Sequence, residues 1–192
     1  MDFQLRPQTV VTGRTDSDFY PTPRWCTLAL LTQGAPPAGA SVLDPSCGEG
    51  AILDVFRERG HNTLGLELDP ARAAVAQERG HYVYNNDATL FPWPEHADWL
   101  VGNPPYSLAL DFAWKAAEWV DWAKAPIPRR AALLLRLSFL EPASGRAVLF
   151  ERHRPDVLIL PRRPMFDGKG HDSITSAWFC WPGEGRLVWL PP

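Results

Sequence analysis

The chain has 192 residues, of which 45% are hydrophobic and 21% are charged, and its formal net charge is −3. This length and composition fit one compact globular domain and exclude a globally disordered chain. We therefore expect one domain over residues 1–192, with residues 1–15 as a loose N-terminal arm. The N-terminus has no apolar signal segment, and no run approaches the roughly 18 apolar residues of a membrane span, so we expect a cytoplasmic protein.

The charge is distributed unevenly along the chain. Residues 1–100 carry 7 Lys and Arg against 13 Asp and Glu, whereas residues 101–192 carry 12 against 9. Basic residues of the second half cluster at positions 129–130, 152–154 and 162–163, with Lys169 nearby. These clusters fit either a phosphate-facing surface or solvated helix ends and loops. The three cysteines, Cys26, Cys47 and Cys180, lack metal-ligand spacing, so we expect free thiols and no metal.

Strand and helix patterns alternate along the first two thirds of the chain. Apolar runs bounded by turn residues predict strands over 41–44, 62–68, 81–84, 99–102 and 131–137. Apolar residues at three-to-four spacing predict helices over 24–33, 51–59, 70–79, 108–123 and 144–152. Strands over 156–160 and 175–181 follow, with 186–190 as a candidate edge strand.

This alternation predicts an α/β fold, with a Rossmann-like, doubly wound and mostly parallel sheet of seven strands. The closing strands predict one antiparallel strand near the C-terminus. In such sheets ligands bind outside the carboxyl ends of the strands. The polar motifs of this sequence all follow predicted strands, so we expect them to meet at that edge.

The first motif, DPSCGEG over residues 44–50, connects a predicted strand to a predicted helix. Its two glycines allow positive φ and close approach of a ligand to the backbone. The spacing matches neither the dinucleotide fingerprint nor the P-loop. Asp44 and Glu49 disfavour a phosphate, so a ligand with a cationic group fits better.

Two acidic residues follow the next strands. Glu67 ends the second predicted strand, where an acidic side chain is placed to accept hydrogen bonds from a ribose diol, as in Rossmann folds. The alternative role, a cap for the following helix, is already filled by Asp69. Asp87 follows the third strand and could accept from the exocyclic amine of an adenine ring. An Asx turn after Asn85 and Asn86 is the alternative interpretation of Asp87.

Asn103-Pro104-Pro105-Tyr106 follows the fourth strand. The prolines fix φ and lack N–H groups, and Asn103 is kept out of the helical region because it precedes a proline. The motif is thus a rigid cluster of hydrogen-bond acceptors beside an aromatic ring. Taken alone, it fits an ordinary Asn-Pro turn equally well.

The ordered set DPSCGEG, GLELDP, NNDA and NPPY resembles the class I S-adenosylmethionine-dependent methyltransferases. NPPY resembles the amino-methyltransferases, above all the N6-adenine DNA methyltransferases, and Tyr20-Pro21-Thr22-Pro23 resembles their Thr-Pro motif. Phe166 resembles the late aromatic residue that packs on the target base. The short length and the basic loop around Phe166 are similar to phage-type enzymes, without a separate target-recognition domain.

The resemblance implies a site for S-adenosylmethionine and assigns roles to residues within it. Tyr20 and Thr22 would contact its amino-acid end, the loop after Asp44 its methionine portion, Glu67 its ribose and Asp87 its adenine. The full set of implied cofactor-binding residues is Tyr20, Thr22, Asp44, Ser46, Cys47, Gly48, Gly50, Glu67, Leu68, Asp87 and Ala88.

The resemblance also implies the catalytic residues and the partner. Asn103 and the Pro104 carbonyl would accept the hydrogens of the target amine, with Pro105 in the same turn. Tyr106 and Phe166 would sandwich a flipped base. Further substrate contacts would come from Arg162, Arg163 and Lys169.

The expected partner is DNA, and the expected state is a monomer or homodimer. RNA adenine and protein glutamine are alternative substrates, and a nucleic-acid-binding protein that kept the fold without catalysis is an alternative from another class.

Overall fold

A computed structural model of the chain describes residues 20–121, 129–141, 143–165 and 174–192. The expected loose arm, residues 1–15, lies outside the described residues, as do Phe166 and Lys169. Within the described ranges, no helix is both long and apolar enough to cross a membrane.

The protein is built on one sheet of eight strands in the order β3-β2-β1-β4-β5-β7-β6-β8. All neighbouring strands are parallel except β7, which runs antiparallel to both β5 and β6. The strands are β1 (Ser41–Asp44), β2 (Asn62–Glu67), β3 (Tyr82–Asn85), β4 (Trp99–Gly102), β5 (Arg130–Arg136), β6 (Asp156–Ile159), β7 (Ser176–Trp181) and β8 (Leu187–Trp189). This confirms the predicted α/β fold with its antiparallel strand near the C-terminus.

The predicted number of seven strands is wrong by one. The additional strand, β8, has three residues and pairs in parallel with β6 at the edge of the sheet. It lies within residues 186–190, the candidate edge strand of the sequence analysis, and its exposed Leu187 and Trp189 flank the partly buried Val188.

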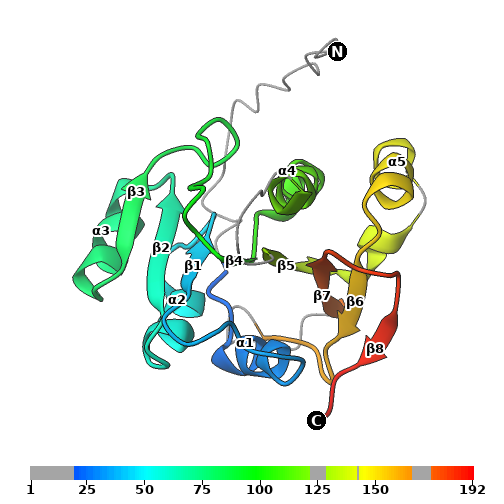
Figure 1. Cartoon of the computed structure of the whole chain (residues 1–192), viewed down its shortest axis with the longest axis horizontal. Coiled ribbons are helices and arrows are strands. Elements are labelled where there is room, and N and C mark those ends of the chain that lie inside the picture. The colour runs from blue at the N-terminus through cyan, green and yellow to red at the C-terminus, as the bar shows by residue number, and fades with distance from the viewer. Residues whose placement is uncertain (1–19, 122–128, 142, 166–173) are drawn as a thin grey trace.

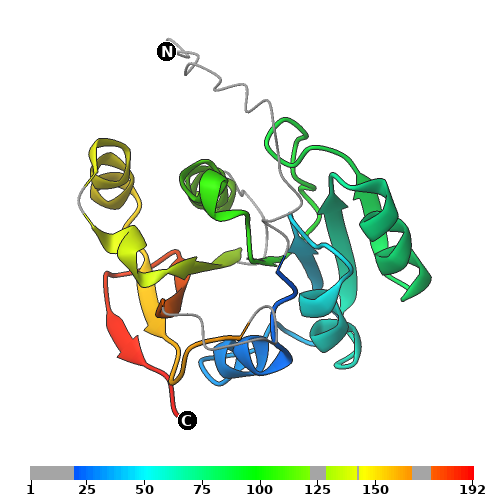
Figure 2. The same cartoon turned by 180° about the vertical axis from the view of Figure 1, so that it is seen from behind.

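Helices cover both faces of the sheet, as Figures 1 and 2 show. On one face, α4 (Ala109–Asp121) and α5 (Ser144–Arg152) pack in a large apolar cluster with alternate residues of the strands. On the other face, α1 (Arg24–Leu31) and α2 (Ala51–Arg57) share a second cluster. A third, smaller cluster joins α2 to α3 (Pro70–Glu78) and β3.

The central strand β5 contributes to both large clusters. Leu133 and Leu135 face α4 and α5, whereas Ala132 and Leu134 face α1. Both faces are therefore covered, which explains why the strand reads as a nearly continuous apolar run. Two 3₁₀ helices, Tyr106–Leu108 and Leu137–Leu140, follow β4 and β5 and were not expected from the sequence.

The start of α3 follows the sequence-based expectation in detail. The Asp69 carboxylate accepts hydrogen bonds from the backbone N–H groups of Ala71 at 2.8 Å and Arg72 at 3.1 Å. Pro70 occupies the first helical turn, where its missing N–H has no intrahelical partner to lose. This cap fixes the chain immediately after the carboxyl end of β2.

Candidate active site

The carboxyl ends of β1, β2 and β4 surround a cavity of about 340 Å³. Most of the residues predicted for cofactor binding and catalysis line it: Tyr20, Thr22, Asp44, Ser46, Cys47, Glu67, Leu68, Ala88, Asn103, Pro104, Pro105 and Tyr106. Gly48, Gly50 and Asp87 are absent from its lining. The topology thus brings five motifs, spread over more than 80 positions of the chain, to one edge of the sheet.

The turn after β1 places the polar groups of Asp44 and Ser46 at the wall of the cavity. Asp44 Oδ1 accepts a hydrogen bond from the Ser46 N–H at 3.0 Å, and Gly48 and Gly50 have φ of 54° and 91°. Burial, with a contribution from the nearby Glu67 carboxylate, raises the pKa of Asp44 to about 7, while hydrogen bonding from Ser46 opposes the shift. The Ser46 hydroxyl is buried beside the Asp44 carboxyl group. These groups favour a cationic, hydrogen-bonding ligand.

Close packing at the end of β4 depends on Gly102. A Cβ atom there would lie 3.0 Å from both Asp44 Oδ1 and Pro45 Cδ. The two motifs that follow β1 and β4 therefore approach each other more closely than an alanine at this position would allow.

The Glu67 carboxylate joins two loops at the cavity wall. Its Oε2 atom accepts from the Gly48 N–H at 2.9 Å, and its Oε1 atom accepts from the Asp69 N–H at 2.9 Å. Each carboxylate oxygen can accept more than one hydrogen bond, so these contacts leave room for a ligand hydroxyl. Gly48 therefore has a structural connection to the site even though it does not line the cavity.

Asp87 is engaged within its own turn. Its Oδ1 atom accepts from both the N–H and the hydroxyl of Thr89, at 2.9 and 2.7 Å. This is the Asx turn that the sequence offered as an alternative interpretation. The neighbouring Asn86, which the sequence analysis did not select, lines the cavity instead.

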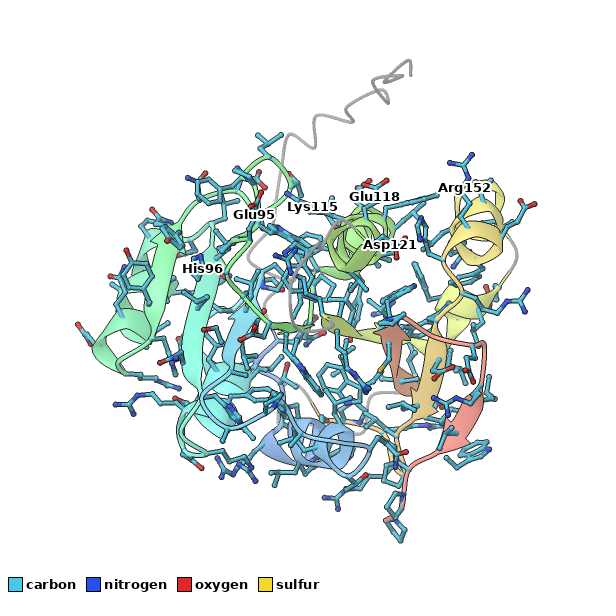
Figure 3. All side chains as sticks on the ribbon, viewed as in Figure 1. Glu95, His96, Lys115, Glu118, Asp121 and Arg152 are labelled. Atoms are coloured by element: carbon cyan, nitrogen blue, oxygen red, sulfur yellow. The ribbon has the colours of Figure 1, made fainter. Side chains whose placement is uncertain are left out.

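Lys115 on α4 holds the loop that carries Ala88. Its ammonium group donates to the carbonyl oxygens of Ala88 and Phe91, both at 2.6 Å. Burial lowers the pKa of Lys115 to about 8, while the charge of Asp87 opposes that shift. Figure 3 shows Lys115 on α4 beside the loop that bears Glu95 and His96. An i-to-i+24 contact of this kind leaves no local pattern in the sequence.

The Asn103 amide is held by the segment that precedes α1. Its Nδ2 atom donates to Thr22 Oγ1 at 3.1 Å and approaches the Tyr20 carbonyl oxygen at 3.5 Å. A carbonyl oxygen only accepts, so this contact fixes which end of the amide carries the nitrogen. The Oδ1 atom is therefore directed away from Tyr20 and Thr22 and is available as an acceptor.

Tyr106 begins the 3₁₀ helix after the two prolines and lies beneath a cation. The guanidinium carbon of Arg136, at the end of β5, lies 4.0 Å from the centroid of the Tyr106 ring. Arg136 was missed in the sequence analysis, although its position at the carboxyl end of the strand after β4 was a usable signal. Phe112, Arg72 and Arg79, which line the cavity, were also missed.

The basic clusters do not all reach the site. The Arg162 guanidinium lies 4.6 Å from the Trp25 ring centroid, and Arg162 and Arg163 do not line the cavity. Arg129 is buried and donates to the carbonyl oxygens of Trp119 and Glu95. The proposal of a phosphate-facing surface thus does not extend to Arg129, which holds its own loop together.

Comparisons with known proteins agree with this geometry. A family model described as methionine biosynthesis protein MetW matches residues 28–97, which is less than half of the chain. Type II methyltransferase M.TthHB8I of Thermus thermophilus is 35% identical over 75 residues, covering 38% of this chain and 17% of the relative. Malonyl-[acyl-carrier protein] O-methyltransferase of Serratia marcescens is 34% identical over 70 residues, covering 35% and 28%. The chain thus spans less than a third of either relative.

A solved structure extends the likeness across the fold. The modification subunit of a putative type I restriction enzyme from Vibrio vulnificus YJ016 matches with a TM-score of 0.64 at 18% identity. The match covers 88% of this chain and 46% of that one. Together with the strand order, these similarities identify the fold as the Rossmann-like fold of class I methyltransferases.

Proposed function

We propose that this protein transfers a methyl group from S-adenosylmethionine to the N6 amine of adenine in DNA. The observation that carries the proposal is the Asn103 amide beside a cavity at the strand ends, whose nitrogen is held by Thr22 and whose oxygen has no hydrogen-bond partner among the described residues. An acceptor fixed in this way, next to the Pro104 carbonyl, suits an amine that must present two hydrogens.

The residues of the cavity fit the proposed cofactor. Asp44 would receive its ammonium group, the Ser46 hydroxyl its carboxylate, and Glu67 its ribose hydroxyls. Leu68, Asn86 and Ala88 would contact its adenine ring. When bound, S-adenosylmethionine supplies a methyl group that is already activated by a positively charged sulfur.

The chain's own residues would act by positioning. The lone pair of an adenine N6 amine is delocalised into the ring, so the amine is a poor nucleophile. Two acceptors, Asn103 Oδ1 and the Pro104 carbonyl, would hold both hydrogens and favour a tetrahedral nitrogen whose lone pair faces the methyl group. The proton would leave to water after transfer, so no strong base is needed.

A base inside a duplex cannot reach these acceptors. The target adenine would have to be extruded from the helix and stacked on Tyr106. Related polymers offer similar amines: RNA contains the same base, and a protein glutamine side chain has a delocalised amide nitrogen. Because the chain matches only parts of its relatives, the choice among these substrates has to be tested directly.

The test is labelled methyl transfer from S-adenosylmethionine to unmethylated DNA, RNA and protein, each followed by analysis of the modified unit. We expect N6-methyladenine in DNA. Label confined to protein or RNA would overturn the proposed substrate, and cofactor binding without transfer to any of the three would favour a non-catalytic binding protein.

A further inference from the structure

We infer that Arg136 binds a phosphate of the target strand beside the flipped nucleotide. The inference rests on the proposed function and narrows it, because it requires a polyanionic substrate at this site. It concerns a residue that the family resemblance did not select and that does not line the cofactor cavity.

The position of Arg136 places it beside the catalytic turn. It ends β5, whose neighbour β4 leads directly into Asn103. Arg136 pairs with Ser176 on antiparallel β7, and directly paired side chains emerge on the same face of a sheet. Leu134 lies two positions before Arg136, and its partner Trp178 lies two positions after Ser176. Both pack in the cluster that faces α1. Arg136 and Ser176 therefore share the α1 face.

The same end of that face receives the segment before α1, where Thr22 contacts Asn103 at 3.1 Å. Arg136 reaches the catalytic turn itself, since its guanidinium lies over the ring of Tyr106. A substrate base stacked on the other face of the Tyr106 ring would thus have its sugar and phosphates close to a fixed positive charge.

Two buried polar groups at this end of β5 and β7 lack hydrogen-bond partners within the described part of the chain. The buried Arg136 Nε atom and the Ser176 hydroxyl, which belongs to a residue only 1% exposed, each have no hydrogen-bond partner there. No described carboxylate forms an ion pair with Arg136, whose one recorded contact is the Tyr106 ring. A guanidinium retains its charge at any physiological pH. Its stacking on Tyr106 leaves in-plane N–H donors for an external acceptor.

A phosphate satisfies this arrangement best. Its oxygens accept the paired N–H donors of a guanidinium in a bidentate manner and neutralise the charge. A glutamine side chain carries no negative charge, so a protein substrate that presents it would leave the positive charge of the guanidinium without a counter-charge. The charge therefore favours a nucleic acid over a protein substrate for the proposed reaction.

The experiment measures binding of a labelled oligothymidine that carries one adenine, with S-adenosylhomocysteine present to prevent turnover. Single-stranded and duplex forms are compared, and the tighter one is used. A second probe replaces the phosphates that flank the adenine with uncharged methylphosphonates. The proteins are the wild type, Arg136→Gln, Arg136→Lys and the matched control Arg130→Gln, whose side chain lies over Trp99 at the other end of β5.

We expect the wild type to bind the methylphosphonate probe about tenfold more weakly than the phosphate probe. Arg136→Gln should bind the phosphate probe about tenfold more weakly than the wild type does. It should bind the methylphosphonate probe as the wild type does, so the effects of the two changes on affinity are not additive. Its log–log salt slope should fall by about 0.7 for a single strand. Arg130→Gln should behave as the wild type, and Arg136→Lys should keep part of the sensitivity.

Calorimetric binding of S-adenosylhomocysteine and the midpoint of thermal unfolding show whether each variant is folded. If Arg136→Gln is unfolded, the comparison rests on Arg136→Lys, for which an unchanged methylphosphonate response and salt slope would overturn the inference. The inference would also be overturned if methylphosphonate substitution weakened binding by the same factor in the wild type and in Arg136→Gln. A wild type that neither binds nor methylates any polynucleotide would instead contradict the proposed function itself.

Discussion

The two halves of the sheet differ in how their strand ends satisfy polar groups. Around β2 and β3, Glu67 accepts two backbone N–H groups, and Asn85 donates to the carbonyl oxygens of Glu67 and Leu68, both at 2.9 Å. At the ends of β5 and β7, Arg136 Nε and the Ser176 hydroxyl have no partner among the described residues. In the first half, around β2 and β3, these polar groups hold neighbouring loops together, whereas in the second half, at the ends of β5 and β7, two buried polar groups have no partner among the described residues.

The comparisons follow the same division. The matching family model covers residues 28–97, so it includes the proposed cofactor side and ends before the proposed catalytic turn at Asn103. The relatives named above include an O-methyltransferase and a type II methyltransferase, whose names differ in the acceptor that they imply. We therefore look for the proposed determinants of substrate choice in the second half of the sheet, which the family model does not reach.

The largest difference between cofactor binding and methyl transfer is expected for Asn103→Ala. Removal of a preorganised acceptor should lower methyl transfer by a factor on the order of 10²–10³ while S-adenosylmethionine still binds. Steady-state kinetics and calorimetry check the two effects separately. Thr22→Val, which removes one of the two contacts of the amide nitrogen, should give a smaller loss. Unchanged turnover in Asn103→Ala would remove this residue from the mechanism.

The cofactor side is tested by Asp44→Asn, which should weaken S-adenosylmethionine binding roughly tenfold at pH 8. Since burial raises the pKa of Asp44 to about 7, the wild-type carboxyl is largely protonated below that pH and attracts the ammonium group less. Wild-type affinity should therefore rise with pH up to about 7 and then level off. The variant should lack this step, and an identical pH profile in both proteins would contradict the assignment.

The same pKa gives a stability test of the ligand-free protein. The folded pKa of Asp44 lies above its unfolded value, so its neutral form contributes stability that is present in acid and is lost as pH rises toward 7. At pH 8 the free energy of unfolding should be about 2–4 kcal/mol higher for Asp44→Asn than for wild type. The difference should shrink toward pH 5, which denaturant titrations at the two pH values can measure.

A smaller effect is expected for Lys115→Met, which breaks the link between α4 and the loop around Ala88. The carbonyl oxygens of Ala88, Thr89 and Phe91 lose their donor, so the free energy of unfolding should fall by about 1–3 kcal/mol. Cofactor affinity should decrease a few fold, because Ala88 lines the cavity. Asp111→Asn, an exposed charge change on the same helix, is the control. If both variants have equal cofactor affinity, Lys115 does not support the site.

The smallest effect is predicted for Glu58→Gln. Glu58 pairs with Arg24, but both side chains are about half exposed, so water and salt screen the attraction. The midpoint of urea unfolding and the rate of methyl transfer should both remain at the wild-type values. A measurable loss of activity would show that the surface of the first half contributes to the site.

Sequence reasoning succeeded where the structure is determined by local chemistry. The cap at Asp69 with Pro70, the turn after Asp44 and the placement of Asn103 at a strand end follow from residue spacing and proline geometry. It failed where distant segments meet. The stack of Arg136 on Tyr106 and the contact of Lys115 with Ala88 depend on which strands and helices become neighbours.

Asp87 illustrates a third situation, in which the sequence offered two interpretations that only geometry separates. Its carboxylate could face a ligand or close its own turn, and both uses require the same residue at the same distance from β3. The hydrogen bonds to Thr89 show the second use.

The Glu67 carboxylate has a consequence for the speed of binding. Because it already connects Gly48 with Asp69, the two loops that flank the cavity are fixed relative to each other before any ligand arrives. Ordering these loops therefore adds little entropic cost to association. Stopped-flow traces of S-adenosylmethionine binding should accordingly show one concentration-dependent phase, without a slower isomerisation step.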